Sequence, residues 1–180
     1  RRPVDVGQHR VGDGDEHAEP ADGVLVVGED RELVVGPRQD PASPYSGVIS
    51  IFMTRALSGT PPVINGDGLQ TRDFVYVGDV VQALLAAATS PAAPGRVFNV
   101  GTGRSVSILD LWRTIARLAG TDVRPTHGPG RPGDVLHSLS SIAAARRDLQ
   151  FAPRVDFGEG LARTLEWYRR SAGGSNRKEH

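Results

Sequence analysis

Hydrophobic residues along the chain change repeatedly between short continuous runs and a helical spacing. The continuous runs are bounded by Gly, Pro, Asn or Asp, which is typical of short strands. Between them, apolar residues recur every three or four positions, as in amphipathic helices. Asp79 and Ser107 are expected to cap two of these helices, and Gly59 is expected to end the first one. We therefore expect strands at 24–27, 33–35, 63–64, 73–77, 97–100 and 123–126, and helices that begin near 44, 79, 107, 141 and 156.

Strands and helices thus alternate, which predicts an α/β fold. The helices are few, and the strands are short and separated by Gly/Pro turns. This pattern favours a small substrate-binding lobe over a complete doubly wound domain. The first 21 residues show neither spacing, and we expect them to be irregular. The segment from 171 to 180 is polar and is expected to be a flexible tail.

Composition narrows the possible chemistry. The 180 residues hold 21 basic and 21 acidic side chains, so the zero net charge argues against binding nucleic acid or an anionic membrane through bulk charge. No apolar run approaches the roughly 20 residues that span a bilayer, and we expect a cytoplasmic protein. The absence of Cys excludes disulfides and a Cys nucleophile. We expect no metal site.

The single lysine, Lys178, sets a further limit. None of the three tyrosines (Tyr45, Tyr76 and Tyr168) has Lys four residues later, so the sequence contains no Tyr-x-x-x-Lys pair. We therefore assign no catalytic residue in this chain.

Arg72 is the first candidate ligand-binding residue. It follows the tight turn at 65–68 and precedes an apolar stretch, and a guanidinium there could bind a diphosphate with two parallel hydrogen bonds. The alternative is a surface ion pair with Asp73 or Asp79, which the spacing alone favours, because isolated arginines are usually solvated.

The Gly/Pro-rich loop at 128–133 carries a second candidate pair. Arg131 could bind phosphate, and Asp134 could accept a hydrogen bond from a ribose or sugar hydroxyl. A surface turn with an internal Arg–Asp pair is an equally good interpretation. The turn at 101–105 resembles a phosphate-binding turn but lacks the third glycine of the dinucleotide motif, and a structural turn is the favoured interpretation.

Taken together, five segments in order resemble the C-terminal half of NAD-dependent nucleotide-sugar epimerases and dehydratases, which are extended short-chain dehydrogenases/reductases. They read Gly-Pro-Arg-Gln-Asp-Pro (36–41), Asn-Gly-Asp-Gly (65–68), Thr-Arg-Asp-Phe-Val-Tyr-Val-Gly-Asp-Val (71–80), Phe-Asn-Val-Gly-Thr-Gly (98–103) and Arg-Pro-Gly-Asp-Val-Leu-His-Ser (131–138). The resemblance is greatest to UDP-glucose and UDP-N-acetylglucosamine 4-epimerases. It implies a partial Rossmann-type α/β fold, mainly the C-terminal substrate lobe.

The resemblance also implies roles for single residues. Arg72 and Arg131 would bind the UDP diphosphate, and Asp134 would hold a ribose hydroxyl. The stretch 63–65 would face the uracil. Within that stretch, Val63 and Asn65 would contact the base, and the amide of Val48 would donate to a phosphate. Ser138 would be a small gate residue beside the sugar that leaves room for an N-acetyl group, and Pro37 would lie near the nicotinamide. The implied cofactor is NAD, the implied partner is a UDP-sugar, and the intact family forms homodimers.

The chain departs from the family pattern before residue 36. The Gly-rich NAD turn and the Tyr-x-x-x-Lys pair should both precede this point, and neither is present. The family's Tyr-Phe-Asn before Gly-Pro is replaced by Arg31, Glu32 and Leu33. We therefore expect 1–35 to be a non-matching segment that is disordered or read from a wrong frame, and 36–170 to bind the nucleotide sugar.

Four functions stay open. The chain is interpreted as a fragment of a UDP-sugar 4-epimerase that is inactive alone. It could instead be a noncatalytic nucleotide-sugar-binding module, a decayed gene product, or part of a 4,6-dehydratase or decarboxylase of the same family.

Overall fold

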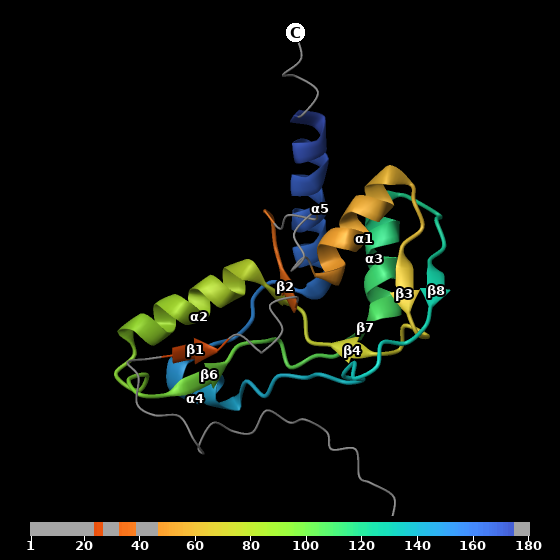
Figure 1. Ribbon diagram of the computed structural model, residues 1–180. Helices are drawn as coiled ribbons and strands as arrows, with labels where there is room; N and C mark the ends of the chain where they lie inside the picture. Colours follow the sequence, from red (N-terminus) through yellow and green to blue (C-terminus); the bar gives the residue numbers. More distant parts are fainter. Residues whose placement is uncertain (1–23, 27–32, 39–46, 175–180) are drawn as a thin grey trace, which may run out of the picture.

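The computed structural model describes residues 24–26, 33–38 and 47–174 (Figure 1). The helices are α1 (Val48–Ser58), α2 (Val77–Thr89), α3 (Ile108–Ala119), α4 (Ala143–Leu149) and α5 (Phe157–Gly174). The strands are β1 (Val24–Val26), β2 (Val34–Val35), β3 (Val63–Asn65), β4 (Thr71–Arg72), β5 (Val75–Tyr76), β6 (Val97–Asn99), β7 (Val106–Ser107) and β8 (Thr126–Gly128).

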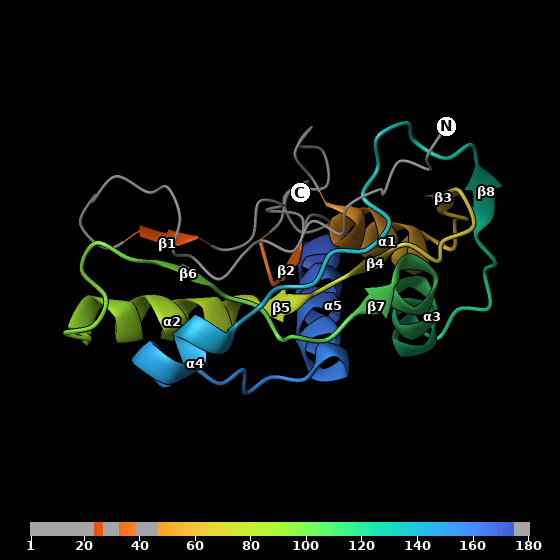
Figure 2. The same ribbon diagram turned by 90° about the horizontal axis from the view of Figure 1, so that it is seen from below.

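The strands form four pairs, three of which are parallel. Parallel pairs join β1 to β6, β2 to β5 and β3 to β8, and an antiparallel pair joins β4 to β7. Figure 2 shows two groups of elements along the molecule: β1, β6, α2 and α4 at one end, and α1, α3, β3 and β8 at the other. Parallel pairing of strands that are distant in sequence confirms the α/β prediction.

The larger core lies where α1, α3 and α5 meet. Phe52 and Trp112 are buried, and their rings pack edge to face with centroids 5.5 Å apart. Leu161 and Leu165 of α5 are almost fully buried in the same cluster. Such an arrangement of three helices buries one apolar stripe of each, which is the main source of helix stability in proteins.

A smaller core joins α2 and α4 through β6. Ala83, Phe98, Leu149 and Phe151 are buried there. The opposite side of α2 is apolar but uncovered in the described structure, since Leu85 is 65% exposed.

Asp79 does not cap its own helix, so that prediction is wrong. Helix α2 already begins at Val77, which also shortens the predicted strand at 73–77 to β5. The Asp79 side chain is buried and accepts hydrogen bonds from the backbone N–H groups of Arg154 (3.0 Å) and Val155 (3.2 Å). These two amides lie in the loop before α5 and need acceptors once they are buried, which is why the carboxylate is used there.

Two other boundaries differ from the prediction. The strand expected at 123–126 is β8, which lies further along because its register is set by pairing with β3. Helix α5 continues to Gly174, so the first part of the expected tail is helical, because no Gly or Pro lies between Gly160 and Gly173. The expected helix start at Pro44 and the residues 175–180 lie outside the described residues. The boundaries at 36 and 170 stay predictions.

Ser107 caps α3, as the sequence predicts. Its hydroxyl accepts a hydrogen bond from the backbone N–H of Asp110 (3.0 Å) and donates one to the Asp110 carboxylate (2.7 Å). The Ser107 hydroxyl, followed by Arg113, lowers the pKa of Asp110 below its ordinary value of 3.8. Because the charged form of Asp110 is the one stabilised in the folded state, its contribution to stability is present above that value and is lost as the pH falls through the lowered pKa.

We predict that Ser107→Ala lowers the free energy of unfolding by about 1 kcal/mol at neutral pH, the usual cost of losing an N-cap. The difference from the parent should narrow below pH 3.8, where Asp110 becomes protonated. Denaturant unfolding at several pH values measures both effects. Ser105→Ala is the control, because this exposed hydroxyl lies two residues away and caps no helix. Equal stability of the two variants would contradict the prediction.

A buried carboxylate also holds the turn after β6. Asp73 is 2% exposed and accepts hydrogen bonds from the backbone N–H groups of Thr102 (2.9 Å) and Gly103 (2.9 Å) and from the Thr102 hydroxyl. A Cβ on Gly101 would lie 2.6 Å from the Asp73 carboxylate and 2.7 Å from Cβ of Ser140. The turn at 101–105 is therefore structural, as favoured from the sequence.

We predict that Gly101→Ala destabilises the fold by about 1–3 kcal/mol, because the added methyl group overlaps buried atoms. The thermal unfolding midpoint measures this effect. Gly130→Ala is the matched control, since a Cβ there meets nothing within 4 Å. An unchanged midpoint for Gly101→Ala would show that the Asp73 turn can move aside.

Candidate functional site

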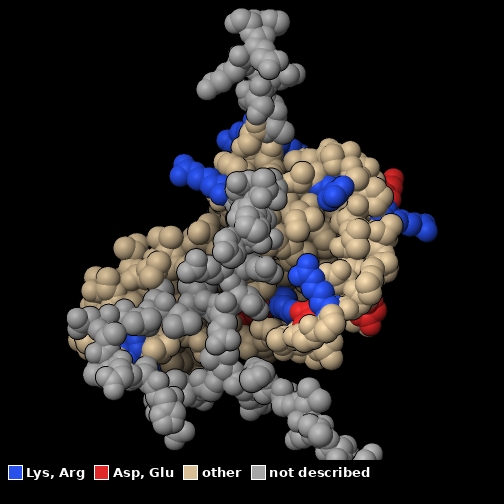
Figure 3. Space-filling view, in the orientation of Figure 1, with Lys and Arg blue, Asp and Glu red and all other residues tan. Residues whose placement is uncertain are grey.

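A small pocket of about 120 Å³ opens between α1, the strands β3 and β4, and the loop from β8 to α4. Figure 3 shows basic and acidic side chains meeting on this face of the molecule. The pocket is lined by Leu33, Val48, Phe52, Val63, Ile64, Asn65, Gln70, Arg72, Ile108, Arg131 and Asp134. Its walls combine apolar side chains with a few polar groups from distant parts of the sequence, as is typical of small-molecule sites.

The pocket brings together six of the eight residues that the sequence indicated. These six are Val48, Val63, Asn65, Arg72, Arg131 and Asp134. The other two, Ser138 and Pro37, are half-buried and do not line it. Ser138 lies beside β4, where its backbone N–H donates to the carbonyl of Thr71 (3.1 Å).

Arg72 fastens the β8–α4 loop to β4. Its Nη2 lies 2.7 Å from Oδ1 of Asp134, and its Nη1 donates to the carbonyls of Val135 (2.6 Å) and Thr71 (2.9 Å). The side chain of Arg72 is only 12% exposed, so this ion pair is shielded from water more than a surface pair. A backbone bond from Thr71 N–H to the carbonyl of Leu136 (2.8 Å) joins the same two segments.

The ion pair of Arg72 with Asp134 differs from the two ion pairs that the sequence offered. A pair with Asp73 or Asp79 is wrong, because each of these carboxylates is buried and accepts backbone N–H groups elsewhere. The alternative of an internal pair within the loop at 128–134 is also wrong, since the carboxylate of Asp134 reaches across to Arg72. The Arg–Asp pair joins two segments 62 residues apart.

Arg131 and the start of α1 give the pocket a positive side. Arg131 is exposed, and no acid among the described residues forms an ion pair with it. Helix α1 begins at Val48, its N-cap Gly47 supplies no side-chain hydrogen bond, and its first turn holds no acidic residue. Among the described residues, no side chain caps this helix end, which carries the positive end of the helix dipole, and such helix ends bind anions.

Sequence reasoning missed the residues that shape the floor of the pocket. Gln70 lines it and donates from Nε2 to the carbonyl of Asn65 (3.0 Å). Its position two residues before Arg72 is the signal that could have found it, because alternate residues of an extended segment share a face. Leu33 also lines the pocket, at the place where the family pattern has Asn, so an apolar group replaces an amide there.

The chain is similar to known nucleotide-sugar enzymes. The family model "NAD dependent epimerase/dehydratase family" matches residues 26–101. This chain contains part of an epimerase-family domain. The chain is 43% identical over 136 residues to a UDP-glucose 4-epimerase of Mycolicibacterium smegmatis. The aligned residues cover 76% of this chain and 43% of that protein. A dTDP-glucose 4,6-dehydratase of Streptomyces griseus is 34% identical over 74% of this chain and 39% of its own length.

A solved structure of a UDP-glucose 4-epimerase with UDP-glucose, from Thermotoga maritima, is similar in fold. Its TM-score is 0.74 at 40% identity, covering 77% of this chain and 44% of that one. The partial α/β fold expected from the sequence is confirmed. This epimerase-family chain spans less than half the length of these relatives.

The family is NAD-dependent, but the described residues do not supply a site for the pyrophosphate of NAD. Such a site needs a glycine-rich turn from a strand into a helix. The connection from β2 to α1 contains no G-x-G-x-x-G pattern, and the turn between β6 and β7 is occupied by the Asp73 contacts. Pro37 follows β2 and is half-buried. No step through NAD is derived from these residues.

Two further features are absent from the described residues. None of their helices has the length and apolar character needed to cross a membrane. Within the same ranges, no group of three or more His, Asp or Glu side chains is placed to hold a metal ion.

We predict that Arg72→Lys loosens the β8–α4 loop, because one ammonium group cannot replace the three contacts of the guanidinium. Losing one charge-assisted hydrogen bond costs about 1.5–3 kcal/mol, so the amides of Thr71 and Ser138 should exchange with solvent at least about tenfold faster. Hydrogen exchange measures this rate. Arg113→Lys, in the exposed pair with Asp110, is the control. Unchanged exchange in Arg72→Lys would show that backbone bonds alone hold the loop.

Proposed function

We propose that this chain is the nucleotide-sugar-binding part of an NAD-dependent 4-epimerase of the UDP-glucose or UDP-N-acetylglucosamine type. The observation that carries the proposal is the pocket, in which six residues implied by the family resemblance meet from four separate segments of the chain. The names of the M. smegmatis and T. maritima relatives support a UDP-sugar as the ligand.

The diphosphate would lie between Arg131 and the start of α1. Arg131 is the one pocket cation without a carboxylate partner in the described structure. The amide of Val48 would donate to a phosphate oxygen. A guanidinium has five N–H donors, and the contacts of Arg72 use three of them, so Arg72 retains donors for a second phosphate oxygen.

The nucleoside would occupy the β3 side of the pocket. Val63 is 61% exposed and can contact the base, and the groups of Asn65 supply hydrogen bonds to the uracil edge. Asp134 would accept a ribose hydroxyl at Oδ2, because Oδ1 already holds Arg72. We infer that Ser138 acts as the small gate beside the sugar and admits an N-acetyl group.

Catalysis by this chain alone is not expected. The 180 residues contain no Tyr-x-x-x-Lys pair, so the family's proton-transfer group has no counterpart here. We do not expect this chain alone to bind NAD, because its described residues supply no glycine-rich turn from a strand into a helix for the pyrophosphate. A cytoplasmic location and the homodimer of the intact family stay predictions.

A noncatalytic nucleotide-sugar-binding module is the second candidate. The six pocket residues that meet, together with the missing Tyr-x-x-x-Lys pair, favour it. The exposed apolar side of α2 (Val81, Leu84 and Leu85) favours instead a fragment whose covering part is absent, or a decayed product that aggregates. A fragment of a 4,6-dehydratase or decarboxylase would have the same pocket but would bind another nucleotide sugar there.

We predict that the purified chain binds UDP, UDP-glucose and UDP-N-acetylglucosamine in calorimetric titrations. Arg131→Gln should weaken UDP binding at least about tenfold, since a charge-assisted contact with phosphate is lost. Arg55 is an exposed arginine of α1 that does not line the pocket, so Arg55→Gln should bind UDP like the parent.

The outcomes separate the candidates. A folded chain that unfolds cooperatively but binds none of the three ligands would contradict the proposal. Preference for dTDP-glucose over the UDP-sugars would favour the dehydratase alternative, and failure to obtain a cooperative transition would favour a decayed product.

A further inference from the structure

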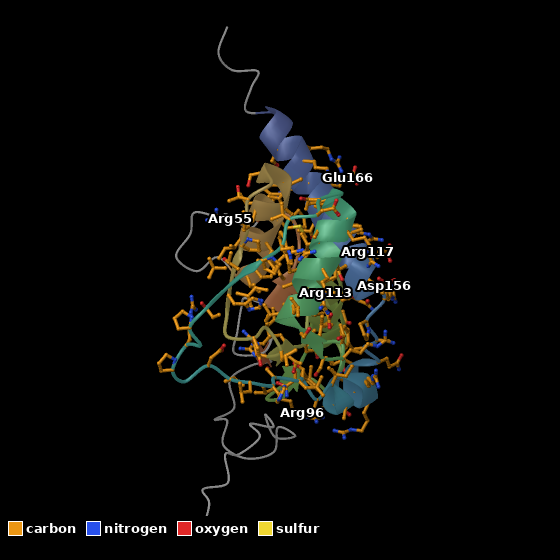
Figure 4. The ribbon with its side chains drawn as sticks, turned by 90° about the vertical axis from the view of Figure 1, so that its right-hand side faces the viewer. Arg55, Arg96, Arg113, Arg117, Asp156 and Glu166 are labelled. Atoms are coloured by element: carbon orange, nitrogen blue, oxygen red, sulfur yellow. The ribbon has the colours of Figure 1, made fainter. Side chains whose placement is uncertain are left out.

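A second hollow lies on the face opposite the first pocket. It has a volume of about 390 Å³ and lies between the β6–β7 connection and the loop from α4 to α5. Figure 2 shows these two connections on the side of the molecule away from the β8–α4 loop, and Figure 4 shows Asp156, one of the lining residues, across the molecule from that loop. The lining residues are Phe74, Thr102, Arg104, Val106, Arg146, Ala152, Pro153, Arg154, Val155, Asp156 and Phe157.

Three arginines from three separate segments line this hollow. Arg104 follows β6, Arg146 lies on α4, and Arg154 lies in the loop before α5. All three are exposed, and no acid within the described ranges forms an ion pair with any of them. Other arginines of the fold do pair with acids, as Arg96 does with Asp148 at 2.9 Å. The hollow therefore concentrates positive charge that the described residues leave uncompensated.

The backbone under each arginine is fixed by a hydrogen bond. The N–H of Arg104 donates to the Thr102 hydroxyl (3.2 Å), and that of Arg154 donates to the buried Asp79 carboxylate (3.0 Å). The N–H of Arg146 donates to the carbonyl of Ile142 within the start of α4 (2.9 Å). The backbone at the three arginines is thus held in place, so a ligand has to order only their side chains.

The only carboxylate in the lining already has a structural partner. Asp156 accepts a hydrogen bond from the backbone N–H of Glu159 (2.8 Å) and so caps α5. The positive end of the dipole of this long helix faces the same hollow, since Phe157 is its first residue and lines it. Phe74 and Val106 give the remaining wall an apolar character.

We propose that this hollow is a binding site for a small phosphorylated molecule that carries two linked phosphoryl groups, separate from the pocket lined by Arg72 and Arg131. The three guanidinium groups and the start of α5 match a compact multiple negative charge. A volume of about 390 Å³ fits a ligand of metabolite size, because such sites usually enclose about 300–1,000 Å³. The apolar wall would contact the uncharged part of the molecule.

Inorganic pyrophosphate is the probe for this site, titrated calorimetrically into the full 180-residue chain at moderate ionic strength. The triple variant Arg104→Gln, Arg146→Gln, Arg154→Gln should lose at least about tenfold in affinity at this site, because its charge-assisted contacts are removed. The control triple variant Arg55→Gln, Arg117→Gln, Arg124→Gln removes the same charge from exposed arginines outside both hollows. It should stay within about twofold of the parent.

Arg131→Gln separates the two sites, since it removes the free cation of the first pocket only. Pyrophosphate binding that persists in Arg131→Gln and disappears in the Arg104/Arg146/Arg154 variant supports the proposal. Equal losses in both triple variants would show that only net charge matters, and would overturn it. No loss in the Arg104/Arg146/Arg154 variant would overturn it as well. The single variants Arg104→Gln and Arg146→Gln repeat the test if the triple variant does not fold.

Discussion

The first pocket depends on the contacts between the Arg72 guanidinium and the β8–α4 loop. That loop is rich in Gly and Pro and has little regular structure of its own, so its position is set by what it is bound to. Arg72 supplies this contact through the Asp134 carboxylate and the Val135 carbonyl. The same contacts bring Arg131, three residues before Asp134, to the start of α1. The position of the Arg131 charge at the pocket thus depends on a partly shielded ion pair rather than on the loop itself.

Two buried carboxylates perform a similar task at the other side of the molecule. Asp73 accepts the amides of the turn after β6, and Asp79 accepts those of the segment before α5. Each carboxylate is 2% exposed, and its desolvation is offset by the backbone N–H groups that would otherwise be buried without acceptors. These two contacts shape the walls that carry Arg104 and Arg154.

The sequence predicts the ends of helices better than it predicts side-chain contacts between distant segments. The capping box at Ser107 and the helix end at Gly59 are local signals, and both are present in the structure. Asp79 carries the same local signal as Ser107, yet it serves a distant segment, because local pattern cannot show which amides become buried. Pairing of Arg72 with Asp134 could not be predicted from spacing for this reason. The family resemblance assigned the two residues to one site but did not show that they bind each other.

The break between β4 and β5 is what allows one short segment to serve both faces. Arg72 and Phe74 are two residues apart, and in a continuous strand their side chains would lie on the same side. Here Arg72 lines the first pocket and Phe74 the second hollow, while Asp73 between them is buried against the 101–103 turn. A substitution that straightened this segment would therefore disturb both faces together. Variants that separate the two sites have to be placed at their rims, at Arg131 and Arg104, where the backbone of the shared segment is not involved.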